Sequence, residues 1–433
     1  MHQLADELNG ILEGTVAGRL LSGMGRRFYF PKGIVAQAAE AGSGASFANG
    51  TIGMAYSNGR PMILSAIADS MAPLSPEESV AYAPTAGIGK ARIAWRDLMI
   101  RKNPSLDPEK MSLPVVVAGL TCGLSCAADM FTGNGKSLIT SDPCWDNYSL
   151  IFEVRRNATL VSVPFFDPRS GLNIGGIGSA VMEMAKSGTV RILLNFPNNP
   201  SGYSPSPAEA DALVGIIDDA ARGGADVLVL CDDSYFGLFY EDGIERESLF
   251  AKFAGLHERV LAVKIDGPIK EDFAWGLRIA FLTFASKGLG RAHYDALVTK
   301  LSGALRSSIS CSNTSAQHLM LRTMEDPRAQ VEKAEFRETL FRRYRLVKDF
   351  VEARPNHPVL RALPFNSGYF MSFLCGVDAQ ALRRELLSGH GIGLVSLGEN
   401  CLRIAFSGID EEKIVPTLET VYETAEKMAG GES

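Results

Sequence analysis

Seven short apolar runs between residues 114 and 283 constrain the fold more than any other feature of this sequence. They are rich in Val, Ile and Leu, and longer stretches with helical periodicity separate them. Strands that are apolar on both faces and alternate with helices are typical of a mostly parallel sheet covered by helices. The predicted strands are 114–117, 137–141, 160–164, 190–195, 225–231, 260–265 and 278–283.

Both ends of the chain depart from this rhythm. Residues 41–50 are rich in Gly, Ala and Ser, and the charged segment 329–354 predicts a long, exposed helix followed by strands at 369–373 and 402–406. A chain of 433 residues is also too long for one small core. We therefore predict a large α/β domain over 62–326 and a smaller α+β domain built from 1–61 and 327–433.

The composition excludes several classes of protein. The net charge of −6 gives no basic footprint for nucleic acid. No apolar run approaches the roughly 20 residues that cross a bilayer, and residues 1–13 do not resemble a secretory signal. Seven scattered cysteines suggest neither a disulfide framework nor a metal site. The expected partners are small molecules, with no nucleic acid and no membrane, in the cytoplasm.

Polar residues gather where the predicted strands end. The segment 195–202, Asn-Phe-Pro-Asn-Asn-Pro-Ser-Gly, follows one strand, and 231–237, Cys-Asp-Asp-Ser-Tyr-Phe-Gly, ends another. Alone, the first could be an ordinary turn and the second a helix cap. Ligands of open α/β sheets bind at the carboxyl ends of strands, so both segments are candidates for a site.

Two lysines compete as a nucleophile near the sixth strand. Lys264 lies inside the apolar run, where it could be a salt-bridged residue, and Lys270 lies in the loop beyond, eight residues before Arg278. Farther on, Arg403 stands alone in an apolar strand-like run. A buried arginine needs an anionic partner, because burying it unpaired is costly.

Taken together, these motifs resemble the fold-type-I aminotransferases of class I/II, the group of the aspartate and aromatic amino-acid enzymes. The resemblance runs from about Tyr82 to Phe406, with five motifs in the family's order and spacing. It implies pyridoxal 5'-phosphate (PLP) as cofactor. Lys270 then matches the lysine that forms the Schiff base and shuttles the proton, and Arg278 matches the arginine that grips the phosphate.

The resemblance also assigns the groups around the cofactor ring and the substrate. Asp232 matches the acid that pairs with the pyridine nitrogen, and the adjacent Asp233 is the alternative. Asn199 and Tyr235 match the hydrogen-bond donors to the phenolic oxygen. Arg403 matches the arginine that binds the substrate α-carboxylate.

Three further segments agree with the family. Gly119, Leu120 and Thr121 open a helix after a Val-rich strand and resemble the phosphate-binding turn. Trp145 resembles the aromatic residue that stacks on the ring, with core packing as the alternative. Tyr82 resembles the tyrosine that reaches the phosphate of the neighbouring subunit, which implies a homodimer with shared active sites.

Some positions depart from the family or leave its details open. Gly267 stands where a phosphate-binding serine is common, and Ser201 replaces a threonine. Arg306 resembles the arginine that reads a second carboxylate across the dimer, but another alignment makes it structural. Walls of the substrate pocket are expected near 30–34 and 51–54.

The resemblance implies a reversible aminotransferase that works by a ping-pong cycle. Its substrate is expected to be aspartate, glutamate or an aromatic amino acid, with 2-oxoglutarate as acceptor. A PLP-dependent lyase or decarboxylase on the same scaffold is the alternative, because fold does not fix the reaction. A non-catalytic relic would have little reason to keep Lys270, Asp232 and Arg403. A nucleotide-binding protein is disfavoured because no complete P-loop is present.

Overall fold

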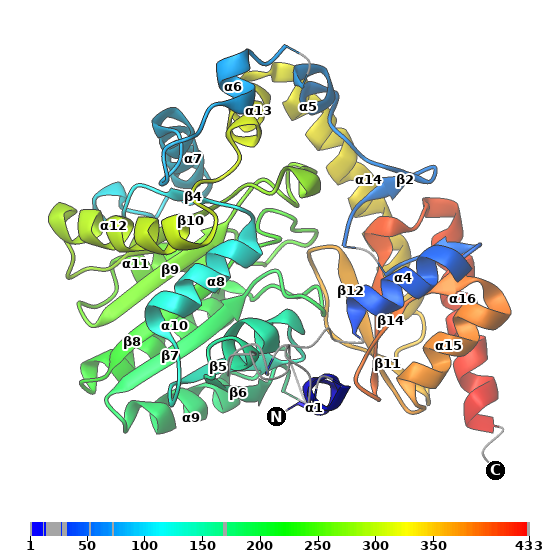
Figure 1. The fold of residues 1–433 in the computed structure, drawn as a ribbon. Coiled ribbons are helices and arrows are strands. Elements are labelled where there is room, and N and C mark those ends of the chain that lie inside the picture. The colour runs from blue at the N-terminus through cyan, green and yellow to red at the C-terminus, as the bar shows by residue number, and fades with distance from the viewer. Residues whose placement is uncertain are drawn as a thin grey trace.

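The larger part of the molecule is built on a seven-stranded sheet. The computed structural model describes residues 2–11, 13, 27, 33–51, 53–71, 73–167 and 171–430. The strand order is β4-β10-β9-β8-β7-β5-β6, and all neighbours are parallel except β10, which is antiparallel to β4 and β9 (Figure 1). The strands are β4 (Val115–Val117), β5 (Ser137–Asp142), β6 (Thr159–Pro164), β7 (Thr189–Asn195), β8 (Asp226–Asp232), β9 (Val260–Asp266) and β10 (Ala280–Ala285).

All seven predicted strands are present, with shifts of one or two residues at their ends. The central strands are buried along almost their whole length, as their β-branched composition indicates. The predicted start of the last strand is two residues too early, because the strand begins at Ala280 rather than at Arg278. Arg278 has a φ of 51°, a left-handed conformation that no strand can hold.

Helices cover both faces of this sheet. The sheet has a hydrophobic core on each face. Helix α8 packs near α12 over one core, and α9, α10 and α11 enclose the other. Helices α7 and α13 enclose a third, smaller cluster of buried residues. Helix α10 shows why these segments are helical, because Ser206 and Glu209 form a reciprocal capping box with Pro207 at the first helical position. These helices are α7 (Gly89–Lys102), α8 (Leu120–Phe131), α9 (Ile174–Ala185), α10 (Pro207–Arg222), α11 (Leu249–Ala254), α12 (Arg291–Ser308) and α13 (Thr314–Glu325).

A second, four-stranded antiparallel sheet lies beside the first (Figure 1). Its order is β11 (Leu360–Ala362), β12 (Phe370–Cys375), β15 (Cys401–Ala405) and β14 (Val395–Leu397). Helices α4 (Ile34–Gly44), α15 (Ala379–His390) and α16 (Glu411–Gly430) surround it. Strand β1 (Ala48–Asn49) pairs with β13 (Ile392–Gly393), which joins the two ends of the chain.

Helix α14 (Pro327–Glu352) runs from the region of α5 (Ser65–Ser70) to α16 (Figure 1). The prediction of a long helix here is confirmed, but the prediction that it is exposed is wrong. Tyr344, Val347 and Phe350 bury one face against the second sheet, and Leu340 packs into the core beside the large sheet. Most of the charged residues lie on the other face, but Arg343 is buried and donates to the backbone oxygen of Ser407. We propose that α14 marks the boundary between a large domain over 62–326 and a small domain of 1–61 and 327–433.

The remaining elements of the described chain are short. They are α1 (Gln3–Ile11), β2 (Tyr56–Ser57), β3 (Arg60–Pro61), α6 (Pro76–Val80), three 3-10 helices at Pro108–Lys110, Trp275–Leu277 and Phe406–Gly408, and a short π-helix at Ser149–Val154. Among the described helices, none is long and apolar enough to span a membrane.

Candidate active site

A cavity of about 320 Å³ lies at the carboxyl ends of β7, β8 and β9. These three strands are neighbours in the sheet, so the polar segments that follow them converge there. The cavity is lined by Gly53, Met54, Leu120, Thr121, Trp145, Tyr148, Asn195, Asn199, Asp232, Ser234, Tyr235, Ile269, Lys270, Trp275 and Arg278. Eight of the predicted site residues are in this set.

Lys270 directs its amine into the cavity. The Nζ atom donates to the backbone oxygen of Gly53 at 3.0 Å and lies 5.0 Å from the centre of the Tyr235 ring. Burial, followed by the positive charges of Arg278 and Arg403, lowers the pKa of Lys270 to about 7. A large part of the amine is therefore uncharged near neutral pH, as a nucleophile or base requires.

The competing lysine is held in a different place. The Lys264 ammonium is buried, contacts the Asp233 carboxylate and lies 3.5 Å from Asp266. Burial alone would lower the pKa of Lys264, but these two carboxylates outweigh it and raise the pKa. Asp233 also accepts a hydrogen bond from Ser248. Neither Lys264 nor Asp233 lines the cavity, so the structure favours Lys270 and Asp232.

Asp232 is a buried carboxylate that faces the cavity. It accepts hydrogen bonds from the Tyr148 hydroxyl at 2.6 Å and from the backbone N–H and the hydroxyl of Ser234. Burial raises the pKa of Asp232, while the bonds from Ser234 and Tyr148 oppose that rise. Sequence reasoning missed Tyr148, because an aromatic residue 84 positions away from Asp232 has no local signal that separates it from the core.

The start of α8 and Arg278 form a cradle for an anion. Gly119 precedes the helix with a φ of 85°, and a Cβ atom there would overlap the Arg278 guanidinium. Free N–H groups at a helix start, beside an arginine, suit a phosphate. Trp275 lines the same cavity, and its buried Nε1 has no hydrogen-bond partner in the described part of the chain. These groups fit a phosphorylated cofactor.

The missing serine at Gly267 has a structural cause. A Cβ atom at Gly267 would lie 2.9 Å from Cα of Ala280 and 3.0 Å from the backbone oxygen of Ile279. Both contacts are with the neighbouring strand, which cannot move away cheaply. Any side chain at 267 would crowd this strand, which disfavours a phosphate contact from this position.

Arg403 lies next to the cavity without lining it. The buried guanidinium donates to Asn199 Oδ1 at 3.1 Å and to the backbone oxygen of Thr51 at 2.8 Å, over the Phe370 ring. Burial lowers the pKa of Arg403. Its Nε atom is buried without a partner, and no acid forms a salt bridge with it among the described residues. A buried cation in this state is suited to an anionic ligand.

Two further predicted residues, Tyr82 and Arg306, do not line the cavity of this chain. The Tyr82 side chain is 92% exposed, and the exposed Arg306 donates to Ser310 at the end of α12. Both were predicted to act in a neighbouring subunit, so their roles stay predictions. Of the expected pocket walls, Gly53 and Met54 line the cavity, whereas 30–32 and 52 lie outside the described residues.

Comparisons with known proteins show the family and the fold of this chain. Residues 55–421 match the model of the family described as aminotransferase class I and II. The aspartate aminotransferase of Pyrococcus horikoshii is 27% identical over 161 residues, which are 37% of this chain and 38% of that relative. The matched stretch thus spans less than two thirds of the relative's length.

Two solved structures share the fold over nearly the whole chain. An aminotransferase from Anaerococcus prevotii superposes with a TM-score of 0.82 at 21% identity, covering 92% of this chain and 97% of that one. The kynurenine aminotransferase of Pyrococcus horikoshii, solved in complex with PMP, gives a TM-score of 0.78 at 16% identity, covering 96% and 99%.

The fold and the site define an α/β protein of fold type I with a cavity for a phosphorylated cofactor. The match over 55–421 identifies the family, and the chain belongs to the aminotransferases of class I and II. It is thus an enzyme of a family whose cofactor is PLP.

Proposed function

We propose that this chain transfers an amino group between an L-amino acid and a 2-oxo acid by a ping-pong cycle with PLP. The observation that carries the proposal is the arrangement of Lys270, Asp232 and Arg278 around one cavity, with Arg403 beside it. Such a transfer needs an amine that is uncharged near neutral pH, a buried carboxylate and two arginines that can bind anions.

Five residues would hold the cofactor. Arg278 and the start of α8 would bind the phosphate, and Trp145 would stack on the ring. Asp232 would pair with the ring nitrogen, while Asn199 and Tyr235 would donate to the phenolic oxygen. When bound, PLP supplies an electron-accepting ring for the bond electrons of the substrate α-carbon.

The residues of the chain would bring the reacting atoms together. Arg403 would bind the substrate α-carboxylate through two parallel hydrogen bonds, which fixes the orientation of the Cα–H bond. The Lys270 amine would take the proton from the α-carbon and return it during transfer, because it points into the cavity beside the proposed substrate position.

For substrates we propose aspartate, glutamate or an aromatic amino acid, with 2-oxoglutarate as acceptor. The named relative, an aspartate aminotransferase, supports the dicarboxylates. We further propose a homodimer in which Tyr82 and Arg306 reach the partner's site. Arg306→Ala should then reduce activity toward aspartate far more than toward phenylalanine. Equal losses for both substrates would remove Arg306 from this role.

The test is an absorption spectrum of the purified protein with PLP, before and after each amino acid. We expect a visible band that is lost as the amino group moves to the cofactor, with release of one equivalent of 2-oxo acid. Lys270→Ala should bind PLP without the lysine-linked band. A band that persists with every amino acid, or carbon dioxide release without a 2-oxo acid, would contradict the proposal.

A further inference from the structure

Two acidic residues follow Lys270 directly, and both are buried. Glu271 is 6% exposed and Asp272 is 7% exposed. Acids are seldom buried unless they are paired, because removing a carboxylate from water is costly. Nothing in the site described above uses either of them.

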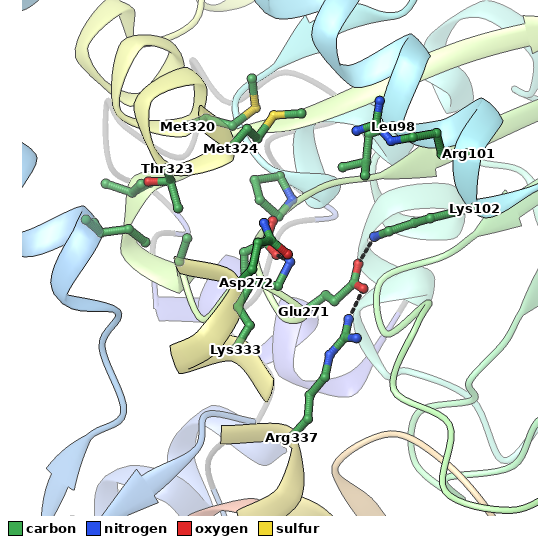
Figure 2. Close-up of a pocket in the computed structure, with 15 residues that line it drawn as sticks. Leu98, Arg101, Lys102, Glu271, Asp272, Met320, Thr323, Met324, Lys333 and Arg337 are labelled. Carbon is green, nitrogen blue, oxygen red and sulfur yellow. Dashed lines mark hydrogen bonds and ion pairs between the residues drawn. The ribbon is translucent and has the colours of Figure 1, made fainter. Parts of the chain in front are cut away.

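Each acid is tied to a helix outside the cofactor cavity. The Glu271 carboxylate is shared by Lys102 at the end of α7 and Arg337 in α14 (Figure 2). Burial alone would raise the pKa of Glu271, but Lys102 and Arg337 outweigh it and lower the pKa. Asp272 forms an ion pair with Lys333, one turn before Arg337 on α14. Glu271 is therefore ionised and bridges two helices.

Glu271 also contacts the turn that carries Tyr235. Gly237 has a φ of 92°, and a Cβ atom there would lie 2.5 Å from Glu271 Oε1. The carboxylate thus lies directly against the backbone of this turn. Any larger residue at 237 would displace it, so Glu271 is fixed on three sides, by α7, α14 and the turn after β8.

Ion pairs act together with packing to hold the loop that carries Lys270. A pocket of about 150 Å³ lies beside Glu271 and Asp272, between α7, α13 and α14 (Figure 2). On its other side the loop is held by the Tyr369 hydroxyl, which donates to the backbone oxygen of Lys270 at 2.8 Å. Beside this open space, the ion pairs of the two acids and the contact between the Phe273 and Phe336 rings tie the loop to α7 and α14.

We propose that Glu271 is a positioning residue that holds Lys270 at the cavity by fixing its loop to α7 and α14. The inference rests on the proposed function only in naming Lys270 as the reactive amine. The charged and titratable groups that face Lys270 are Arg278, Arg403, Asp232 and Tyr235, and those that face Glu271 are Lys102, Lys333 and Arg337. Release of the loop would let water reach the Lys270 amine, which favours its charged form.

The test measures the reactivity of Lys270 in the cofactor-free protein. Wild type and Glu271→Gln are pulsed with acetic anhydride at a series of pH values, and acetylation of Lys270 is read by peptide mass spectrometry. We expect the midpoint of the pH profile for Lys270 labelling to lie about one pH unit higher in the variant, because exposure to water favours the charged amine. The midpoint reports the pKa of Lys270 and does not depend on how easily the reagent reaches the amine. The matched control is Glu183→Gln, which removes the acid of the exposed Glu183–Lys186 ion pair. In this control, Lys270 should be acetylated with the same pH profile as in wild type.

A second variant keeps the test decisive if Glu271→Gln does not fold. Arg337→Met removes one of the two cations from a side chain that is 41% exposed, so it should be tolerated. Glu271→Gln decides the test if it folds, and Arg337→Met decides it only if Glu271→Gln does not. A higher midpoint of the pH profile in the deciding variant supports the proposal, and an unchanged midpoint, even with a lower melting temperature, overturns it. If Lys270 responds as expected but no PLP band forms, the positioning role stands and the proposed function fails.

Discussion

Replacing Tyr148 by Phe tests the support of Asp232. The substitution removes only the hydroxyl that donates to Asp232 Oδ2 at 2.6 Å. The ring keeps its edge contacts with Trp145 and Phe152, so the packing should survive. Both side chains are buried, and water cannot easily replace the lost bond.

The size of the effect follows from the kind of bond. A hydrogen bond to a charged group contributes about 1.5–3 kcal/mol. A change of about 1.4 kcal/mol in a barrier corresponds to a tenfold change in rate. The Tyr148 bond opposes the burial that raises the pKa of Asp232, so its loss should raise that pKa further. Asp232 would then be a weaker partner for the ring nitrogen. We expect a loss of roughly 10- to 100-fold in the rate of the first half-reaction.

The assay is stopped-flow absorbance of the PLP-loaded enzyme mixed with its best amino acid. Tyr203→Phe is the matched control, since its hydroxyl also bonds a carboxylate, Glu209, but lies outside the cavity. The control should lose stability without losing rate. If Tyr148→Phe reacts as fast as wild type across pH, the view that Tyr148 supports Asp232 is refuted.

Three further predictions concern the same site. Gly267→Ser should lower the free energy of unfolding by about 1–3 kcal/mol through overlap with Ala280, without improving PLP affinity in a spectral titration. Lys270→Met should stabilise the cofactor-free protein. In wild type, Lys270 keeps its proton up to about pH 10 in the unfolded chain but releases it near pH 7 in the folded chain. The gain in the free energy of unfolding of the variant over wild type, measured by urea unfolding, should therefore be full below about pH 7 and vanish above about pH 10. Arg403→Ala should raise KM by about 30-fold or more, because a buried carboxylate contact is worth roughly 2–5 kcal/mol; an unchanged KM in steady-state kinetics would place the carboxylate elsewhere.

The sequence predicts the sheet well because its strands are buried on both faces. A run such as 226–232, Asp-Val-Leu-Val-Leu-Cys-Asp, reads as a strand without knowledge of its neighbours. The segments that follow such strands were found for the same reason, since parallel strands bring their carboxyl ends to one edge. The strand ends alone left Lys264 and Asp233 as alternatives, and it was the resemblance to the aminotransferases that selected Lys270 and Asp232.

Contacts between distant segments were not predictable in this way. The partners of Glu271 lie 169 and 66 positions away, and no local pattern joins them. The buried face of α14 was missed because its charged residues hide a sparse apolar stripe. The reason for Gly267 also needs the neighbouring strand, because its cost is set by the backbone of residues 279 and 280.

Arg278 and Arg403 have two effects that depend on the same charge. In the empty site, they add to burial in lowering the pKa of Lys270, which leaves an uncharged amine to attack the cofactor. In the proposed cycle, the phosphate and the substrate carboxylate then pair with these arginines and offset much of their positive charge. The repulsion on the Lys270 amine weakens at that stage, so it becomes the stronger base when it must take a proton from the α-carbon. Binding of the two anions and the basicity of the lysine are thus coupled through the same two side chains.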